Sequence, residues 1–180
     1  MDKIIAIWMC FFLGMISCLS QEIVETIPWQ SQYRLKWSDF RGPVPVDAVP
    51  AATTASGISY RYSANLMHHE VDLDFEVTAY FYPDESWYRP SVCDDNVLAH
   101  EQLHFDISEL YARKMRFKLE RTAFSENVKK EIRDIYQETL NELKDFQEKY
   151  DWETNFSRNL ETQAKWNARI AEALERTSRE

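Results

Sequence analysis

The sequence predicts an α+β fold, in which a small antiparallel sheet comes first, a long helix follows, and two further helices complete the C-terminal part. Apolar residues alternate with polar ones before Pro83, and they recur at three- and four-residue steps after Pro90. The first pattern indicates strands with one buried face, and the second indicates amphipathic helices. Strands followed by helices are typical of α+β folds.

We divide the chain into a leader of residues 1–20, a lead-in segment of residues 21–32 and a single domain over residues 33–180. The leader has a short polar start, an apolar stretch from Ile4 to Ile16 and a final stretch of mostly small residues, as secretory signal peptides do. The stretch is shorter than the roughly 20 apolar residues of a membrane span. We expect cleavage after Ser20, with a lipid anchor at Cys18 as the rival. Either route predicts an exported protein, periplasmic or extracellular.

Three segments of the sheet region alternate as strands do. The segments are 33–40, 58–62 and 71–81, and the last is the clearest, with apolar residues at every odd position and acidic residues at 72, 74 and 76. Such strict alternation predicts a sheet with one buried and one solvated face. Glycine and proline residues between 42 and 50 predict a loop after the first segment.

Three helices are predicted after Pro90. Asp94 and Asp95 suit a helix N-terminus, because their carboxylates cap free N–H groups and favour the positive end of the helix dipole. One apolar stripe of this first helix contains Val97, His100, His104, Ile107, Tyr111 and Met115. The second helix begins near Ser125 and runs to Tyr150, and the third surrounds Trp166.

The charge and the cysteine content of the chain exclude one class of partner and one kind of cross-link. The formal net charge is -9 and the pI is near 5.0, and no basic stripe is visible. We therefore expect no nucleic-acid partner, because binding to phosphates depends on clustered lysine and arginine. After cleavage of the leader only Cys93 remains, so an internal disulfide is excluded.

The strongest chemical signal is the run His100-Glu-Gln-Leu-His104. Histidines four residues apart on a helix project from the same face, where both imidazoles can hold one Zn²⁺ ion. Glu101 lies at the edge of that face, within reach of a water molecule that the zinc activates. This pattern predicts a zinc peptidase helix with His100 and His104 as metal ligands and Glu101 as the catalytic base.

The third zinc ligand has to come from elsewhere in the chain. Asp106 and Glu109 are rotated off the histidine face of the same helix. His68 and His69 are more simply read as a polar pair beside a turn. Asp151 and Glu153 are the remaining candidates, because the helix that carries them must turn back over the first helix.

The chain resembles the bacterial domain-of-unknown-function family 922, described as predicted secreted zinc-dependent proteases, from about Leu35 to Ile170. The motifs are Leu35-Lys-Trp-Ser-Asp-Phe-Arg-Gly42, Ala51-Ala-Thr-Thr-Ala-Ser-Gly-Ile-Ser-Tyr60, His100-Glu-Gln-Leu-His-Phe-Asp-Ile-Ser-Glu-Leu-Tyr-Ala-Arg113, Tyr150-Asp-Trp-Glu-Thr-Asn155 and Gln163-Ala-Lys-Trp-Asn167. The resemblance implies zinc at His100 and His104, a catalytic Glu101, and a histidine ligand shortly after the fourth motif. This sequence has Phe156 there, which cannot bind zinc.

Two functions follow from these expectations. The first is a secreted zinc-dependent metalloprotease-like hydrolase that cleaves peptide or protein substrates, with Tyr150, Tyr111 or His69 as a candidate donor to the oxyanion. The second is a non-enzymatic, envelope-associated binding protein that has lost a complete zinc site. An acid or histidine that converges on His100 and His104 beside an open cleft favours the first, and an apolar plug formed by Phe156 favours the second.

Overall fold

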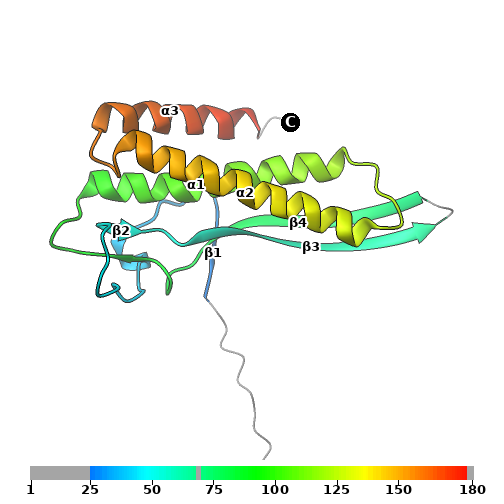
Figure 1. Ribbon diagram of the computed structural model, residues 1–180, viewed down its shortest axis with the longest axis horizontal. Helices are drawn as coiled ribbons and strands as arrows, with labels where there is room; N and C mark the ends of the chain where they lie inside the picture. The colour runs from blue at the N-terminus through cyan, green and yellow to red at the C-terminus, as the bar shows by residue number, and fades with distance from the viewer. Residues whose placement is uncertain (1–24, 68–69, 178–180) are drawn as a thin grey trace, which may run out of the picture.

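The computed structural model describes residues 25–67 and 70–177, and it has the predicted α+β architecture (Figure 1). The leader with Cys18, the beginning of the lead-in segment, and His68 and His69 lie outside the described residues. The helices cover one face of a three-stranded antiparallel sheet of order β1-β4-β3, with a second, two-stranded sheet beside it. The strands are β1 (Ile27–Pro28), β2 (Ala52–Thr53), β3 (Ser56–Met67), β4 (Glu70–Phe81) and β5 (Trp87–Tyr88).

The β3–β4 hairpin confirms the predicted alternation. Its register pairs Ile58 with Ala79 and Ser56 with Phe81. Val77, Ala79 and Phe81 are buried under the helices, whereas the acidic residues at 72, 74 and 76 are exposed. The lead-in segment joins this sheet, because β1 pairs Ile27 with Phe81.

The strand predicted over residues 33–40 is wrong. This segment instead contains the short 3₁₀ helix η1 (Trp37–Asp39), because the Asp39 carboxylate accepts hydrogen bonds from the Lys36 N–H at 2.8 Å and the Tyr33 hydroxyl at 2.9 Å. Those bonds close a turn that a strand cannot contain. The alternating apolar residues still serve the core, since Leu35 and Phe40 are buried.

Helix α1 (Asp95–Glu120) is the central element of the molecule. It begins at the predicted residue, where the Asp94 side chain caps the helix by accepting from the Val97 N–H at 2.9 Å. Its packing partners are β2, β3 and β4 on one side and the two later helices on the other. Phe105, Ile107 and Met115 are fully buried in this core, and each such side chain contributes about 1.5–3 kcal/mol through burial.

Helices α2 (Val128–Thr154) and α3 (Leu160–Arg176) complete the fold as an antiparallel pair over α1. The chain reverses after α1, so the C-terminal end of α2 lies over the N-terminal half of α1 (Figure 1). A single cluster of buried side chains extends from Leu35 to Leu174. This reversal brings the two helix segments that carry the candidate ligands together.

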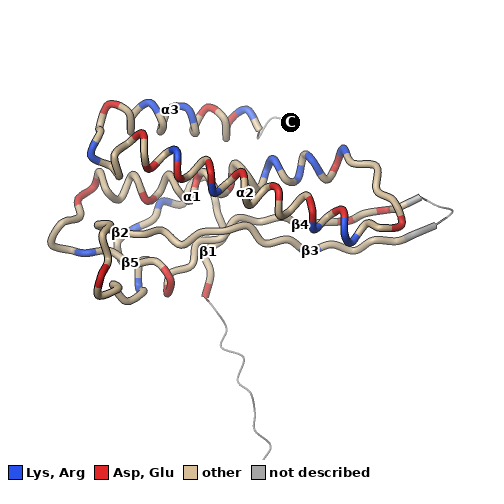
Figure 2. The backbone as a smooth tube through the Cα atoms, viewed as in Figure 1, with Lys and Arg blue, Asp and Glu red and all other residues tan. Residues whose placement is uncertain are grey.

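Charged residues cover the outer faces of the helices. Figure 2 shows acidic and basic residues interspersed along α2 and α3, in agreement with solvated helix faces. None of the helices in the described part of the chain has the length and apolar character needed to cross a membrane.

Candidate metal centre

The two histidines of the motif project from α1 toward α2. Their ring centroids are 4.9 Å apart and their Nε2 atoms 3.3 Å apart. His100 is only 4% exposed and stacks on the Tyr150 ring of α2, whereas His104 meets the edge of that ring. The four-residue spacing on one helix face and the Tyr150 ring, which contacts both imidazoles, therefore hold them in place.

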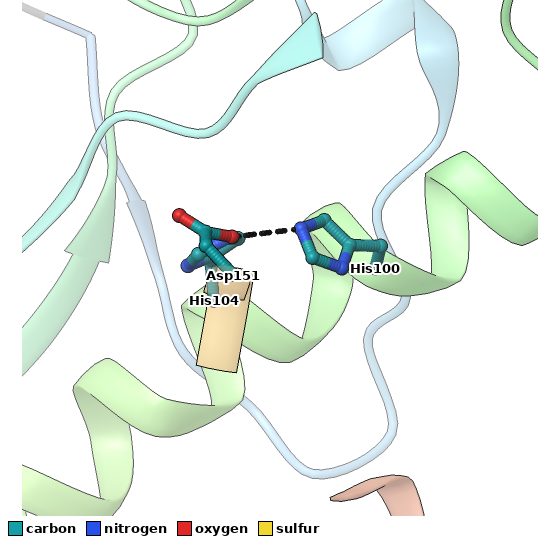
Figure 3. A group of neighbouring side chains, drawn as sticks. All are labelled: His100, His104 and Asp151. Carbon is teal, nitrogen blue, oxygen red and sulfur yellow. Dashed lines mark hydrogen bonds and ion pairs between the residues drawn. The ribbon is translucent and has the colours of Figure 1, made fainter. Parts of the chain in front are cut away.

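Asp151 of α2 completes the cluster. Its Oδ1 atom lies 3.0 Å from His100 Nε2 and 2.9 Å from His104 Nε2, and Figure 3 shows the interaction of the carboxylate with His100 as a dashed line. Among the described residues, this is the group of histidine, cysteine and acidic side chains whose geometry suits a metal ion. The three atoms come from two helices, and the antiparallel packing of α1 and α2 brings them together.

The triangle of ligand atoms has the size that zinc requires. Its sides measure 3.3, 3.0 and 2.9 Å. Tetrahedral zinc with bonds of about 2.0–2.1 Å separates its ligand atoms by about 3.3 Å. Two imidazoles and one carboxylate also match the donor types of catalytic zinc sites, which use three protein ligands and leave one position open. The residues present therefore fit zinc.

Gln163 of α3 orients His100 through the ring nitrogen that does not face Asp151. The Gln163 Oε1 atom lies 3.0 Å from His100 Nδ1, while the amide nitrogen donates to Asn167 Oδ1 at 2.9 Å. An amide oxygen only accepts, so His100 donates from Nδ1 and, when neutral, presents a lone pair at Nε2. That lone pair faces the Asp151 carboxylate and His104 Nε2, an arrangement that requires a proton or a metal cation between them.

The pKa values of Asp151 and His104 are both shifted by the close contact between the carboxylate and the imidazoles. Burial opposes ionisation of Asp151, but hydrogen bonds from His100 and His104 outweigh it and hold the Asp151 pKa well below its usual range. Burial likewise opposes charging of His104, yet the Asp151 hydrogen bond and the charges of Glu101 and Asp151 raise the His104 pKa above its ordinary value. The site therefore attracts positive charge.

The cluster opens on a cavity of about 210 Å³. Glu101 is buried in its wall beside the histidines, and the Thr54 hydroxyl donates to the Glu101 carbonyl oxygen at 3.1 Å. One side of the wall is the chain around β2 and the other is the end of α2. The lining residues are Pro50, Ala51, Ala52, Thr53, Thr54, Val97, His100, Glu101, His104, Gln147, Asp151, Phe156 and Ser157.

Glu153, the other candidate for a third ligand, lies away from the cluster and accepts from Trp166 Nε1 at 2.9 Å. Asp106 and Glu109, which the sequence excluded as ligands, are also engaged elsewhere. Asp106 accepts from Trp29 Nε1 at 2.7 Å, and Glu109 pairs with Arg113 of the same helix at 2.8 Å. Glu153 thus links α2 to α3, and Asp106 links α1 to the segment before the sheet.

The tyrosines predicted as oxyanion donors are not in the cavity wall. Tyr150 is fully buried, and its hydroxyl bonds Gln163 Oε1 at 2.9 Å; burial raises its pKa. Tyr111 packs against Phe146, and burial raises its pKa to about 12. Each is placed there by the apolar stripe of its own helix, so both belong to the packing of the core.

Phe156 occupies the rim of the cavity in an unusual backbone conformation. Asn155, Phe156 and Ser157 have φ values of 48°, 51° and 71°, a left-handed region that a bulky residue rarely adopts. Two hydrogen bonds fix this turn, from Phe156 N–H to the Asp151 carbonyl oxygen at 2.9 Å and from Asn96 Nδ2 to the Ser157 carbonyl oxygen at 2.7 Å. Phe156 therefore lies at the rim, 53% exposed, while Asp151 contacts both histidines.

Gln163 and the segment that begins at Ala51 are parts of the motifs of the family resemblance, but the sequence assigns neither a role at the site. The position of Gln163, a polar residue in phase with the apolar stripe of Trp166 and Ile170, is the signal that could have marked it, and it is 2% exposed. Residues 50–54 carry no signal of a contact with the histidine motif, because they are small and lie far from it in the sequence.

Residues 85–159 match the model of a family described as "Bacterial protein of unknown function (DUF922)". The match includes α1 and α2, and it is shorter than the resemblance expected from Leu35 to Ile170. No curated protein and no solved structure matches the chain. The segment that carries the His100, His104 and Asp151 cluster is therefore similar to the bacterial family of unknown function DUF922, in agreement with the predicted resemblance.

Proposed function

We propose that this protein is an exported zinc-dependent metallopeptidase-like hydrolase that cleaves peptide bonds. The observation that supports this most directly is the convergence of His100 Nε2, His104 Nε2 and Asp151 Oδ1 within 3.3 Å of one another, beside Glu101 and an open cavity. Three protein ligands with space for a fourth are typical of catalytic zinc sites, whereas structural sites are closed by four.

In this proposal each residue of the cluster has a separate role. His100, His104 and Asp151 hold the zinc ion, and Gln163 keeps the His100 Nε2 lone pair directed at it. Bound zinc supplies Lewis acidity, which polarises a peptide carbonyl group and makes water a nucleophile near neutral pH. The Glu101 carboxylate accepts the proton of the attacking water and returns it to the leaving amine.

The chain around β2 offers a place for an extended substrate. Arg89 N–H donates to the Ala51 carbonyl oxygen at 2.9 Å, and β2 pairs with β5 in register Ala52 with Tyr88. Because hydrogen-bonding directions alternate along an antiparallel strand, the Ala52 N–H and C=O face the edge away from β5. A substrate strand that pairs with this edge would lie along the cavity wall formed by residues 50–54.

The alternative function, a binding protein without a complete zinc site, rests on Phe156. Its ring replaces the histidine that the family resemblance implies, and it lines the cavity. However, Asp151 already contacts both histidines, so an acid converges on the motif without any contribution from position 156. This geometry favours the hydrolase.

Metal content is the first test of the proposal. We expect about one zinc ion per chain in the mature protein purified without chelator, and almost none in the His104→Ala variant. Elemental analysis of both samples measures this. If neither sample holds zinc after incubation with excess metal, the hydrolase proposal is refuted.

Activity is the second test. The Glu101→Gln variant should retain zinc but lose peptide hydrolysis by about 10²–10⁴-fold, because the amide cannot accept the proton. Hydrolysis of a quenched fluorescent peptide library by zinc-loaded wild type and variant measures the difference. Equal rates would assign the observed hydrolysis to a contaminant or to another residue.

Export is part of the proposal and has its own measurement. We infer it from the leader of residues 1–20, which lies outside the described residues. Mass spectrometry of the mature N-terminus after expression in a bacterial host distinguishes cleavage after Ser20 from lipidation at Cys18. An intact Met1 in the cell-envelope fraction would argue for an uncleaved anchor.

A further inference from the structure

A second hollow adjoins the metal cavity on the side of Phe156. It has a volume of about 670 Å³ and lies between the loop before β2, the segment before α1 and the turn after α2. Its lining includes Pro50, Ala51, Val97, Phe156 and Ser157, which also line the metal cavity. The two hollows therefore adjoin each other at these five residues, and we name the second hollow the apolar groove.

The walls of the apolar groove expose large apolar side chains to solvent. Val49 is 85% exposed, Leu160 62% and Val92 55%, and Phe156 completes the set. These four residues come from three separate segments between positions 49 and 160, so the fold brings them together. Adjacent apolar side chains exposed at the edge of a site are typical of a binding surface, whereas single exposed ones need no explanation.

The backbone at Phe156 supports the same conclusion. Three consecutive non-glycine residues hold left-handed conformations there, which is unfavourable above all for the bulky Phe156. The conformation places the Phe156 ring at the junction of the two hollows instead of in the core. Strained backbone that is fixed by hydrogen bonds clusters at ligand sites.

We propose that the apolar groove is the side-chain subsite of the metal centre and selects extended peptides that carry a bulky aliphatic or aromatic residue beside the bound segment. The inference rests on the proposed function for its location next to the cluster, but the binding itself does not require hydrolysis. The edge of β2 that carries the Ala52 N–H and C=O aligns the peptide backbone, and Val49, Val92, Phe156 and Leu160 surround the side chain.

The experiment measures binding in the full-length mature protein with the Glu101→Gln substitution and bound zinc. The probes are a fluorescein-labelled decapeptide of glycine and serine with one central leucine, and the same peptide with asparagine in place of leucine. Fluorescence anisotropy should show the leucine peptide binding about tenfold more tightly or better, because an apolar pocket discriminates by such factors for small differences in side chain.

The chain offers a matched control for the groove. Val49 and Val46 lie in the same loop, but Val49 lines the groove, whereas Val46 is fully exposed and lines neither hollow. Val49→Asp should abolish the leucine preference, and Val46→Asp should preserve it. Equal binding of the two peptides, or equal effects of the two substitutions, would overturn the subsite.

The outcomes separate the two proposals. A leucine preference in a protein that never hydrolyses peptides would support the groove and refute the hydrolase, whereas hydrolysis without any preference would refute the groove alone. A dimer that Val49→Asp dissociates in size-exclusion chromatography would assign the groove to self-association and overturn the peptide subsite.

Discussion

Helix α1 separates two hollows that differ in size and in chemistry. The metal cavity measures about 210 Å³, and its polar side chains His100, His104 and Asp151 contact one another. The hollow on the opposite side measures about 760 Å³ and lies between α1, α3 and the segment around Trp29. Its polar side chains have structural partners, since Gln102 accepts from the Leu35 N–H at 2.7 Å and donates to Asp106 at 2.9 Å.

The comparison shows that the candidate site is distinguished by three ligand atoms that lie close together, and not by the volume of its hollow. In the larger hollow the side chain of Gln102 has both a donor and an acceptor among protein groups, so its hydrogen bonds hold segments together and require no ligand. In the smaller one, three groups that each offer a lone pair meet within 3.3 Å, and a cation satisfies all of them. The backbone conformation agrees, because two of the three non-glycine residues with positive φ in the described chain, Phe156 and Ser157, line the smaller hollow.

Removal of the aspartate ligand should produce the largest effect. We expect Asp151→Ala to lose stoichiometric zinc, because two imidazoles alone leave the site one ligand short. Glu153→Ala is the matched control two residues away, and it should keep its zinc while losing about 0.5–1.5 kcal/mol of stability with its hydrogen bond to Trp166. Zinc titration and urea unfolding measure the two quantities. Zinc lost equally from both variants would contradict the assignment of Asp151.

A pair of glutamine substitutions tests the two sides of α1 directly. Gln163→Leu should weaken zinc binding by about 10–100-fold, because it removes the acceptor that orients His100. Gln102→Leu should leave zinc affinity unchanged but cost about 1–3 kcal/mol of stability, since the buried Leu35 N–H loses its partner. Competition with a chromogenic chelator measures affinity, and thermal unfolding measures stability. Equal zinc affinities in the two variants would remove the distinction between the hollows.

The smallest effect concerns the strained rim. Phe156→Asn should raise the free energy of unfolding by up to about 1 kcal/mol relative to Phe156→Ala, because asparagine tolerates the left-handed conformation better. Both variants lose the phenylalanine ring, so the difference between their free energies of unfolding reports the cost of the left-handed backbone conformation at position 156. Chemical denaturation of both proteins measures it, and identical midpoints would show that position 156 stores no strain.

Local patterns predicted much of the fold. Period-two alternation located β4, and the three- and four-residue steps located all three helices, because these patterns reflect which face of an element is buried. The same pattern failed over residues 33–40, where the Asp39 carboxylate closes a turn and the apolar residues reach the core from a loop. The motif placed His100 and His104 on one face of α1, since that geometry depends on one helix alone.

The sequence by itself therefore determined the order of the elements, the two histidines and the neighbouring Glu101. Only the tertiary structure decided that Asp151 and not Glu153 contacts the two histidines. The two acids lie about 160° apart around α2, and packing against α1 and α3 sets the rotation of that helix. It also decided which glutamine faces the cluster and which segments form the apolar groove. Those features depend on contacts between residues that are distant in the chain, and the spacing of residues along one helix or strand does not predict such contacts.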